Sequence, residues 1–314
     1  MQTSISKDTL DRAGERNGLL DLVGDTPLVN VNKVADGVSD DVRVCAKAEW
    51  FNLSGSIKAR PALAMILGAE ESGELTPGQE IIDASSGNTA VAYATLGAAM
   101  DYPVTICIPE NATKERKAIL AGLGAELVFT DPAEEMDGAI RKARELVDEH
   151  PDRYFYPDQY NNNLNWQSHY HTTGPEIIQN TEGNVTHFVA GLGTTGTFVG
   201  TSRYLKEQDD SINVISVQPE TALHGLEGWK HLESSMVPGI YDPDVADREL
   251  RASTGNAYDM MRRLAEEEGL FVGPSAGAAV CAAVDVAREL NEGTVVTILP
   301  DGGEKYMELW NDED

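Results

Sequence analysis

The chain has 314 residues, of which 41% are hydrophobic, and it carries a formal net charge of −28. This length is enough for two domains or for one large α/β unit. The charge excludes nucleic-acid binding, because that function requires a basic surface. No run of about 18 apolar residues occurs, so we expect no membrane helix. The polar segment Met1 to Arg16 lacks the apolar stretch of a signal peptide, and we therefore expect a cytoplasmic protein.

Acidic residues are dispersed over several predicted helix faces instead of being collected in one tail, as at 70–71 and 266–268. Salt weakens self-repulsion of this size, so the sequence predicts a halophilic protein from a salt-rich cell. The three cysteines, Cys45, Cys107 and Cys281, are far apart in apolar segments. They are predicted to be buried free thiols in a reducing compartment and not a disulfide or metal framework.

Apolar segments of β type alternate with helical patterns along the chain. This alternation indicates βαβ units, an α/β fold and mostly parallel sheets. In chain order we predict a strand at 42–49, a helix at 57–72, a strand at 80–84, a helix at 89–100, a strand at 104–109, a helix at 114–123, a strand at 126–130, a helix at 137–149, a strand at 187–191, a helix at 197–207, a strand at 213–218, helices at 257–268 and 276–290, and a strand at 295–299.

The segment 151–170 is rich in Asn, Tyr and Pro and separates two such sets of elements. It predicts a crossover between two domains. Ligands of parallel α/β sheets bind at the carboxyl ends of the strands, in the loops that lead to helices. Four loops of this kind carry polar motifs.

The first loop, residues 51–57, is rich in Gly and Ser and leads to Lys58 at the start of a predicted helix. Backbone N–H groups of such a loop come close to any group that is bound by the lysine amine. A lysine amine in this setting is a candidate for a Schiff base with a carbonyl group. The alternative is an ordinary solvated lysine in a first helical turn.

The second loop, residues 85–89, reads Ser-Ser-Gly-Asn-Thr and opens the next predicted helix. Hydroxyl and N–H groups at a helix N-terminus form an anion site. The fourth loop, residues 273–278, opens a helix in the same way and contains Ser275. In both loops the alternative is an ordinary helix cap.

The third loop, residues 191–197, reads Gly-Leu-Gly-Thr-Thr-Gly-Thr and contains G-x-G-x-x-G. Because Glu220 ends the next strand, a dinucleotide site is a real alternative. The density of threonine favours a single phosphate monoester, since consecutive hydroxyls and amides wrap such a group. A purely structural tight turn is the third possibility.

Together these loops resemble those of the cysteine synthases, which are pyridoxal-phosphate (PLP) enzymes of the β-family, fold type II. The order and spacing agree over roughly residues 20–308. Each motif is weak alone, but seven in the same order are highly specific. The matching motifs are 24–28 (GDTPL), 51–58, 85–89, 170–176 (YHTTGPE), 191–197, 273–277 and 300–306 (PDGGEKY).

The resemblance implies a role for each matching residue. Lys58 would hold PLP as a Schiff base, take the substrate α-proton and later return one. The other expected cofactor contacts are Asn88 to the ring oxygen, Ser275 to the pyridine nitrogen, and Gly193, Thr194, Thr195, Gly196 and Thr197 to the phosphate. The substrate carboxylate would be bound by Ser85, Ser86, Thr89 and Gln159. No metal is expected.

The same resemblance implies a fold of two three-layer αβα domains with PLP in the cleft between them. The smaller domain is expected at 52–157, and the larger one at 1–51 plus 158–314. A homodimer is also implied. The implied reaction replaces the β-substituent of O-acetylserine or O-phosphoserine with sulfide or another sulfur donor, through an α-aminoacrylate, to give L-cysteine.

The choice between the two substrates depends on the loop 219–241, which faces the substrate in this family. A cation there would pair with a substrate phosphate. Lys230 is the candidate, ahead of His224 and His231. The alternative is that Lys230 is a surface cation, and O-acetylserine stays equally open.

Other functions are compatible with part of the pattern. Cystathionine β-synthase, diaminopropionate synthase and serine/threonine deaminase share the cofactor loops and differ in the 219–241 loop. An NAD-dependent dehydrogenase would use 191–196 and would need no Lys58. A non-catalytic assembly partner would have no physical need for Lys58, Asn88 and Ser275.

Overall fold

The computed structural model of the chain describes residues 4–11 and 13–310. They form two compact units, one from the described residues of Met1–Gly24 and Asn52–Gln167, the other from those of Asp25–Phe51 and Ser168–Asp314. The domain division at 51 and 157 stays a prediction; internal contacts group 158–167 with the first unit. Residues 1–3, 12 and 311–314, which that division assigns to the larger domain, lie outside the described residues.

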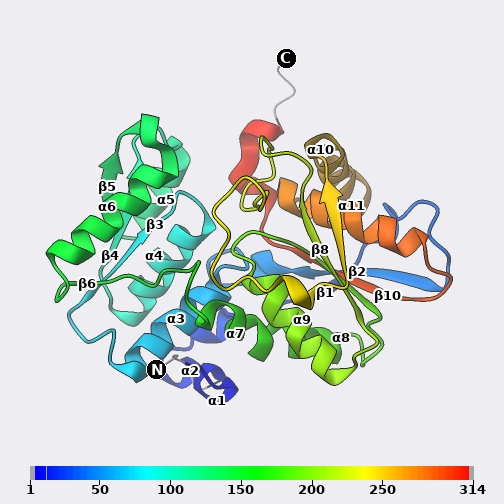
Figure 1. Cartoon of the computed structure of the whole chain (residues 1–314), viewed down its shortest axis with the longest axis horizontal. Coiled ribbons are helices and arrows are strands. Elements are labelled where there is room, and N and C mark those ends of the chain that lie inside the picture. The colour runs from blue at the N-terminus through cyan, green and yellow to red at the C-terminus, as the bar shows by residue number, and fades with distance from the viewer. Residues whose placement is uncertain (1–3, 12, 311–314) are drawn as a thin grey trace. The chain divides into compact units, whose positions relative to one another are not determined.

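The first unit contains a fully parallel sheet with the strand order β5-β4-β3-β6 (Figure 1). Its two central strands are buried along their whole length, which explains their continuous apolar sequence. The strands are β3 (Glu80–Ala84), β4 (Val104–Pro109), β5 (Glu126–Thr130) and β6 (Tyr154–Phe155).

Helices cover both faces of this sheet. Ile81 and Ile106 pack into a core with α3, α4 and α5, whereas Ile82 and Cys107 pack against α6. Successive strand residues point to opposite faces, so this division makes three layers. The helices are α1 (Lys7–Asp11), α2 (Ala13–Arg16), α3 (Ala59–Ser72), α4 (Asn88–Met100), α5 (Lys114–Gly122) and α6 (Glu135–Glu149).

The second unit contains a sheet with the order β1-β2-β10-β7-β8-β9, in which only the β1–β2 pair is antiparallel. Together with the first sheet, it confirms the predicted α/β class with mostly parallel sheets. The strands are β1 (Leu28–Asn30), β2 (Val42–Ala48), β7 (His187–Gly191), β8 (Asn213–Pro219), β9 (Arg248–Ala252) and β10 (Gly293–Leu299).

The helices of the second unit lie on both sides of its sheet, with α10 and α11 on one face and α8 and α9 on the other (Figure 1). Close packing of α10 and α11 requires Gly277, because a Cβ there would lie 2.1 Å from the Ala257 carbonyl oxygen. The helices are α8 (Thr173–Asn180), α9 (Gly196–Gln208), α10 (Thr254–Arg263) and α11 (Pro274–Arg288); α7 (Leu164–His171) runs from the first unit into the second.

The structure adds elements that the sequence pattern did not predict: β1, β6, β9, α1, α2, α7 and α8. β9 carries mostly exposed, charged side chains, and α7 lies within the polar crossover 151–170. Neither has the apolar period that reveals a buried element. The predicted helix 257–268 is corrected at both ends, because α10 begins at Thr254 and the π-helical turn Leu264–Glu268 follows it.

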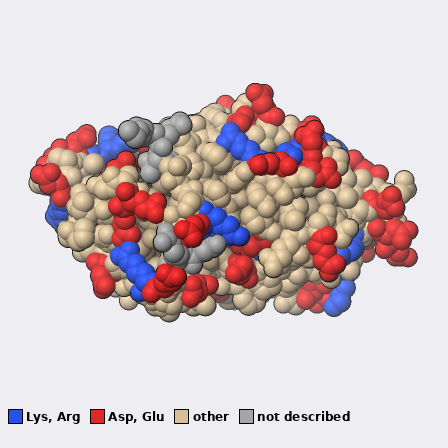
Figure 2. Space-filling model, turned by 90° about the horizontal axis from the view of Figure 1, so that it is seen from below, with Lys and Arg blue, Asp and Glu red and all other residues tan. Residues whose placement is uncertain are grey.

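The acidic residues are dispersed on the surface. On the face in Figure 2, Asp and Glu groups lie in many separate places, and basic groups adjoin several of them. Within the described part of the chain, no helix is both long enough and apolar enough to cross a membrane.

Candidate functional site

Lys58 lies where its loop enters α3. It has helical dihedrals (φ −70°, ψ −16°) and directly precedes Ala59, the first helical residue, so α3 begins two residues later than predicted. The loop turns at Gly55, which has a φ of 68° that favours glycine. The Lys58 N–H donates to Ser56 Oγ at 3.4 Å. Lys58 is half-buried at this helix start.

The 85–89 loop joins β3 to α4. Ser85 is buried and its Oγ accepts the Gly87 N–H at 3.2 Å. Thr89 is also buried, and its hydroxyl donates to Gln159 Oε1 at 3.0 Å. The structure thus brings together two predicted substrate-binding residues that are 70 positions apart in the chain. Ser86 and Asn88 are half-buried.

The 191–197 loop joins β7 to α9 and is fixed by close backbone contacts. A Cβ at Gly193 would lie 2.1 Å from the Gly228 carbonyl oxygen, and one at Gly191 would lie 2.0 Å from Trp229 Cε2. Two of the glycines are therefore required by packing. The Leu192 N–H donates to the Val217 carbonyl at 2.8 Å.

Thr195 is the strained residue of this loop. Its φ of 71° lies in the left-handed region, where a β-branched residue is an outlier. Its side chain is 2% exposed, and its Oγ1 is buried without a hydrogen-bond partner. A strained residue with an unpartnered buried hydroxyl marks a functional loop, since surrounding structure must hold it against this cost.

His169 supports the same loop and was not predicted from the sequence. It is 1% exposed, and its Nε2 lies 3.2 Å from Thr197 Oγ1. Its Nδ1 lies 2.9 Å from Thr173 Oγ1. The available signal was the motif 170–176, because it includes Thr173 and begins at the residue after His169. The contact to Thr197 depends on the tertiary fold.

Ser275 lies in the first turn of α11, after Pro274 at a position that needs no N–H donor. It is 3% exposed. A Cβ at the preceding Gly273 would lie 2.6 Å from Asp301 Oδ1, so the 300–306 motif packs directly against the start of this helix.

Lys230 lies beside the 191–197 loop. Its backbone N–H donates to the Leu192 carbonyl at 2.7 Å, and its side chain is half-buried. Burial lowers the pKa of His224, and the charge of His231 lowers it further. The His224 Nδ1 accepts the Leu226 N–H at 3.2 Å, so it serves the loop's own backbone. Lys230 is thus the candidate that backbone bonding places next to Leu192.

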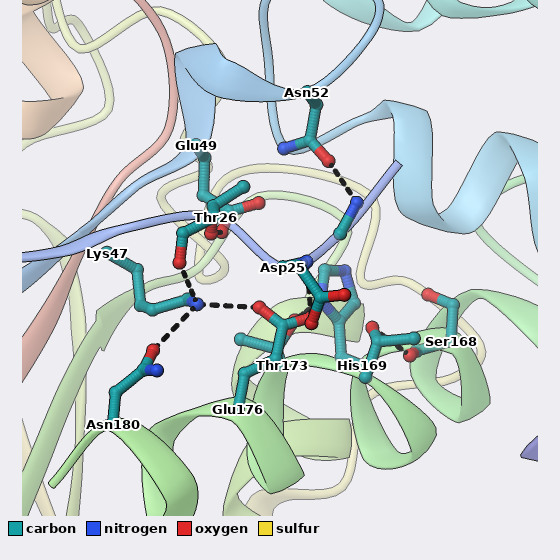
Figure 3. A network of polar contacts seen from close by, with 12 residues as sticks. Asp25, Thr26, Lys47, Glu49, Asn52, Ser168, His169, Thr173, Glu176 and Asn180 are labelled. Carbon is teal, nitrogen blue, oxygen red and sulfur yellow. Dashed lines mark hydrogen bonds and ion pairs between the residues drawn. The ribbon is translucent and has the colours of Figure 1, made fainter. Parts of the chain in front are cut away.

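A buried ion pair fixes α8, the helix that carries Thr173 (Figure 3). Lys47 is fully buried, and its Nζ lies 2.6 Å from Glu176 Oε2 and 2.6 Å from the Thr26 carbonyl oxygen. Glu176 Oε1 accepts the Asp25 N–H at 3.1 Å. The network ties β2 and the segment before β1 to α8, and the 24–28 and 170–176 motifs meet in it.

The residues of the 191–197 loop fit a phosphate group. Thr195 has a hydroxyl without a hydrogen-bond partner, and Gly193 adds no side chain to the loop. The helix α9 begins at Gly196, and its first N–H groups have no partner within the helix. A phosphate dianion only accepts hydrogen bonds. Thr197 would therefore donate to it, and His169 would donate its Nε2–H to Thr197.

Comparison with known proteins identifies the family. A family model described as "Pyridoxal-phosphate dependent enzyme" matches residues 19–301. The chain is 49% identical to the cysteine synthase of Aquifex aeolicus, over 95% of this chain and 94% of the relative. It is 42% identical to cysteine synthase B of Pseudomonas aeruginosa, over 92% and 95%.

A crystal structure of cysteine synthase from Entamoeba histolytica matches with a TM-score of 0.91 at 33% identity, covering 95% of this chain and 91% of that one. None of these three relatives favours an NAD-dependent dehydrogenase, a serine/threonine deaminase or a non-catalytic assembly partner. The chain therefore belongs to the cysteine synthases, within the family of pyridoxal-phosphate dependent enzymes.

Proposed function

We propose that this protein makes L-cysteine by replacing the β-substituent of O-acetylserine or O-phosphoserine with sulfide. The family membership supports the reaction class. The observation that carries the site assignment is the 191–197 loop, whose strained Thr195 offers an unpartnered buried hydroxyl to a phosphate. Lys58, at the start of α3, is proposed as the residue that holds the cofactor covalently.

Each residue then has a defined task. The chemistry that PLP would supply, when bound, is the withdrawal of electrons from the substrate α-carbon. Lys58 Nζ takes the α-proton as the β-substituent leaves, and returns a proton to the α-carbon after sulfur has added. Ser275 accepts or donates one hydrogen bond at the pyridine nitrogen without imposing a charge. Asn88 orients the ring oxygen, and the Thr194 N–H and hydroxyl add to the phosphate contacts of Thr195 and Thr197.

The substrate carboxylate is assigned to the 85–89 loop and Gln159. Ser85, Ser86 and Thr89 supply hydroxyl and N–H donors at the N-terminus of α4, where a helix favours an anion. The 3.0 Å bond between Thr89 and Gln159 supports a shared role.

The covalent assignment to Lys58 is tested by reduction with borohydride. The purified protein should be yellow, and borohydride should abolish its visible band and leave a PLP adduct on the peptide that contains Lys58, as seen by mass spectrometry. Lys58→Ala should fold and lose both the adduct and the activity. Lys114→Ala, which changes an exposed lysine at the start of α5, should retain both. A colourless protein, or an adduct on another lysine, would refute the assignment.

The substrate phosphate is assigned to Lys230. Lys230→Ala should raise the KM for O-phosphoserine about ten-fold to a hundred-fold, because a charge-assisted bond to phosphate contributes roughly 1.5–3 kcal/mol. The KM for O-acetylserine should change little. Lys206→Ala is the matched control, since Lys206 is engaged with Asp247 at 2.8 Å. Equal effects of Lys230→Ala on both substrates would leave it a surface lysine.

We also propose a homodimer that works in the salt-rich cytoplasm of a halophilic cell. The resemblance supports the dimer, and the net charge of −28 supports a salt-rich environment. Cys45, Cys107 and Cys281 are free thiols, which suits a reducing compartment. Sedimentation at micromolar concentration tests the dimer, and a monomer would refute it without affecting the chemistry.

A further inference from the structure

A buried carboxyl group directly precedes the 85–89 loop. Asp83 lies in β3, is 1% exposed, and has a buried Oδ2 without a hydrogen-bond partner. Because strand side chains alternate, Asp83 shares with Ile81 the face of the sheet that α4 covers. Asp83 therefore lies in the core of the first unit and only two residues before Ser85, which begins the 85–89 loop.

A second carboxyl group, that of Asp158, lies beside Gln159. The backbone of Asp158 has a φ of 46°, and its Oδ1 is buried without a hydrogen-bond partner. Its carbonyl accepts the N–H groups of Asn161 and Asn162 at 3.0 and 2.9 Å, and its Oδ2 accepts from Asn161 Nδ2 at 2.8 Å. This turn sets the position of Gln159, which accepts the hydroxyl of Thr89.

The charge of Asp158 acts electrostatically on Asp83. Burial raises the pKa of Asp83 to about 7; the backbone N–H of Ala84 lowers it, and the negative charge of Asp158 raises it. Within the described part of the chain, no cation contributes to this shift. Asp83 therefore holds a proton at a pH at which surface carboxyl groups have lost theirs.

The other titratable groups near Asp83 are also acids. Burial is the first cause that raises the pKa of each of them, and the charge of Asp83 adds to it. They are Tyr93 on α4, Cys107 on β4, and Tyr156 and Tyr160 on either side of Asp158. Two cations of α6 act on two of these neighbouring groups: Lys142 lowers the pKa of Cys107, and Arg144 lowers the pKa of Tyr156.

We propose that Asp83 works as a neutral carboxylic acid that positions Asp158 and, through it, Gln159 for the substrate carboxylate. This inference rests on the function proposed for the 85–89 loop. While Asp83 is neutral, the Asp158 turn keeps its place and Gln159 meets Thr89. When Asp83 ionises, a second negative charge acts on Asp158 in a buried region, and the Asp158 turn is displaced. Asp83 acts through Gln159 and is a positioning residue.

The pH dependence follows from proton binding. An unfolded Asp loses its proton near pH 4, whereas folded Asp83 keeps it to about pH 7. The folded state binds more protons between these values, so the stabilisation is fully present at acid pH and decreases as the pH rises to about 7. Above that pH, the neutral fraction falls about ten-fold per pH unit, and the KM for the amino-acid substrate rises with it.

The test compares Asp83→Asn with the wild-type holoenzyme. The wild-type KM for O-acetylserine should rise about ten-fold between pH 7.5 and 8.5, with a much smaller change in kcat. Asp83→Asn, which is neutral at every pH, should flatten this rise. Asp148→Asn, which changes an exposed residue of α6, should behave like wild type. Because all variants are compared on one substrate, titration of the substrate itself affects their KM values equally.

Infrared spectroscopy provides a readout that needs no activity. The wild type should show the C=O band of a protonated carboxyl group at pH 6 that is absent from Asp83→Asn. Asp158→Asn should retain this band but lose it at a lower pH, because the neighbouring charge is gone. The proposal is overturned if wild type and Asp83→Asn give the same band, or the same KM profile. If β-replacement itself is absent, the proposed function fails, and the infrared band still decides the protonation of Asp83.

Discussion

The two units bury carboxyl groups next to their loops in opposite ways. In the second unit, the Glu176 carboxylate lies 2.6 Å from the buried Lys47 ammonium and accepts a backbone N–H as well (Figure 3). In the first unit, Asp83 is buried with an unpartnered oxygen, and the charge that acts on its pKa is that of another carboxylate, Asp158. Glu176 is therefore a buried carboxylate paired with a cation, whereas Asp83 is a buried carboxyl group on which a like charge acts.

This difference indicates a division of tasks. A paired carboxylate in a hydrogen-bonded network holds a fixed geometry, and α8 carries that geometry to Thr173, His169 and Thr197. An unpaired buried carboxyl group changes its protonation state near neutral pH. We infer that the phosphate loop of the second unit has a fixed geometry and that the 85–89 loop of the first unit responds to pH. Substitutions in the second unit and a salt series test this contrast, from the strongest expected effect to the weakest.

The largest effect is expected from Lys47→Met. The substitution leaves the Glu176 carboxylate buried without its cation, which costs about 3–5 kcal/mol in the free energy of unfolding. Denaturant unfolding at constant PLP measures it. Lys142→Met is the matched control, because it removes a partner of Glu145 from an exposed pair and should cost less than about 1 kcal/mol.

The double variant Lys47→Met, Glu176→Met separates the pair from the packing. It removes both charges, so it should recover much of the stability that Lys47→Met loses. If the double variant is as unstable as the single one, the loss comes from packing, and the contrast between the units is not one of charge.

The next effect is expected from Gly193→Ala. The new Cβ would meet the Gly228 carbonyl oxygen at 2.1 Å, so the backbone of the 191–197 loop must shift, at a cost of about 1–3 kcal/mol. The affinity for PLP should fall at least ten-fold. Gly255→Ala is the control in the same unit, because Gly255 lies in α10 with open space around it. That variant should stabilise the protein slightly and bind PLP normally, by equilibrium dialysis.

The sequence predicted the elements that bury continuous apolar runs. The strands 80–84, 104–109 and 187–191 have the predicted limits, since burial along most of their length leaves a continuous apolar pattern. The edge strand 126–130 also has the predicted limits, although its side chains are only partly buried. Loop motifs likewise identified the residues to examine, from Lys58 to Ser275. β9 could not be predicted, because its charged edge-strand side chains have no apolar alternation.

Contacts between distant segments could not be predicted from the sequence. The positive φ of Thr195, the hydrogen bond from His169 to Thr197 and the approach of Gly193 to Gly228 all depend on where the chain returns in space. Asp83 is an acid within a strand of apolar neighbours, and its position was visible. The effect on Asp83 of Asp158, 75 residues away, required the structure.

The smallest effect is expected from salt, and it separates surface charge from buried charge. At a net charge of −28, repulsion between exposed acids opposes the compact state. The Debye length falls from about 10 Å at 0.1 M to about 3 Å at 1 M, so the Tm should rise by several degrees over this range at saturating PLP. A buried pair is screened much less. The difference in unfolding free energy between wild type and Lys47→Met should therefore stay constant, within about 0.5 kcal/mol, as both proteins gain stability. If the difference shrinks with salt, water reaches Lys47 and Glu176. The second unit would then lack a water-excluded ion pair, and the contrast with the buried Asp83 of the first unit would fail.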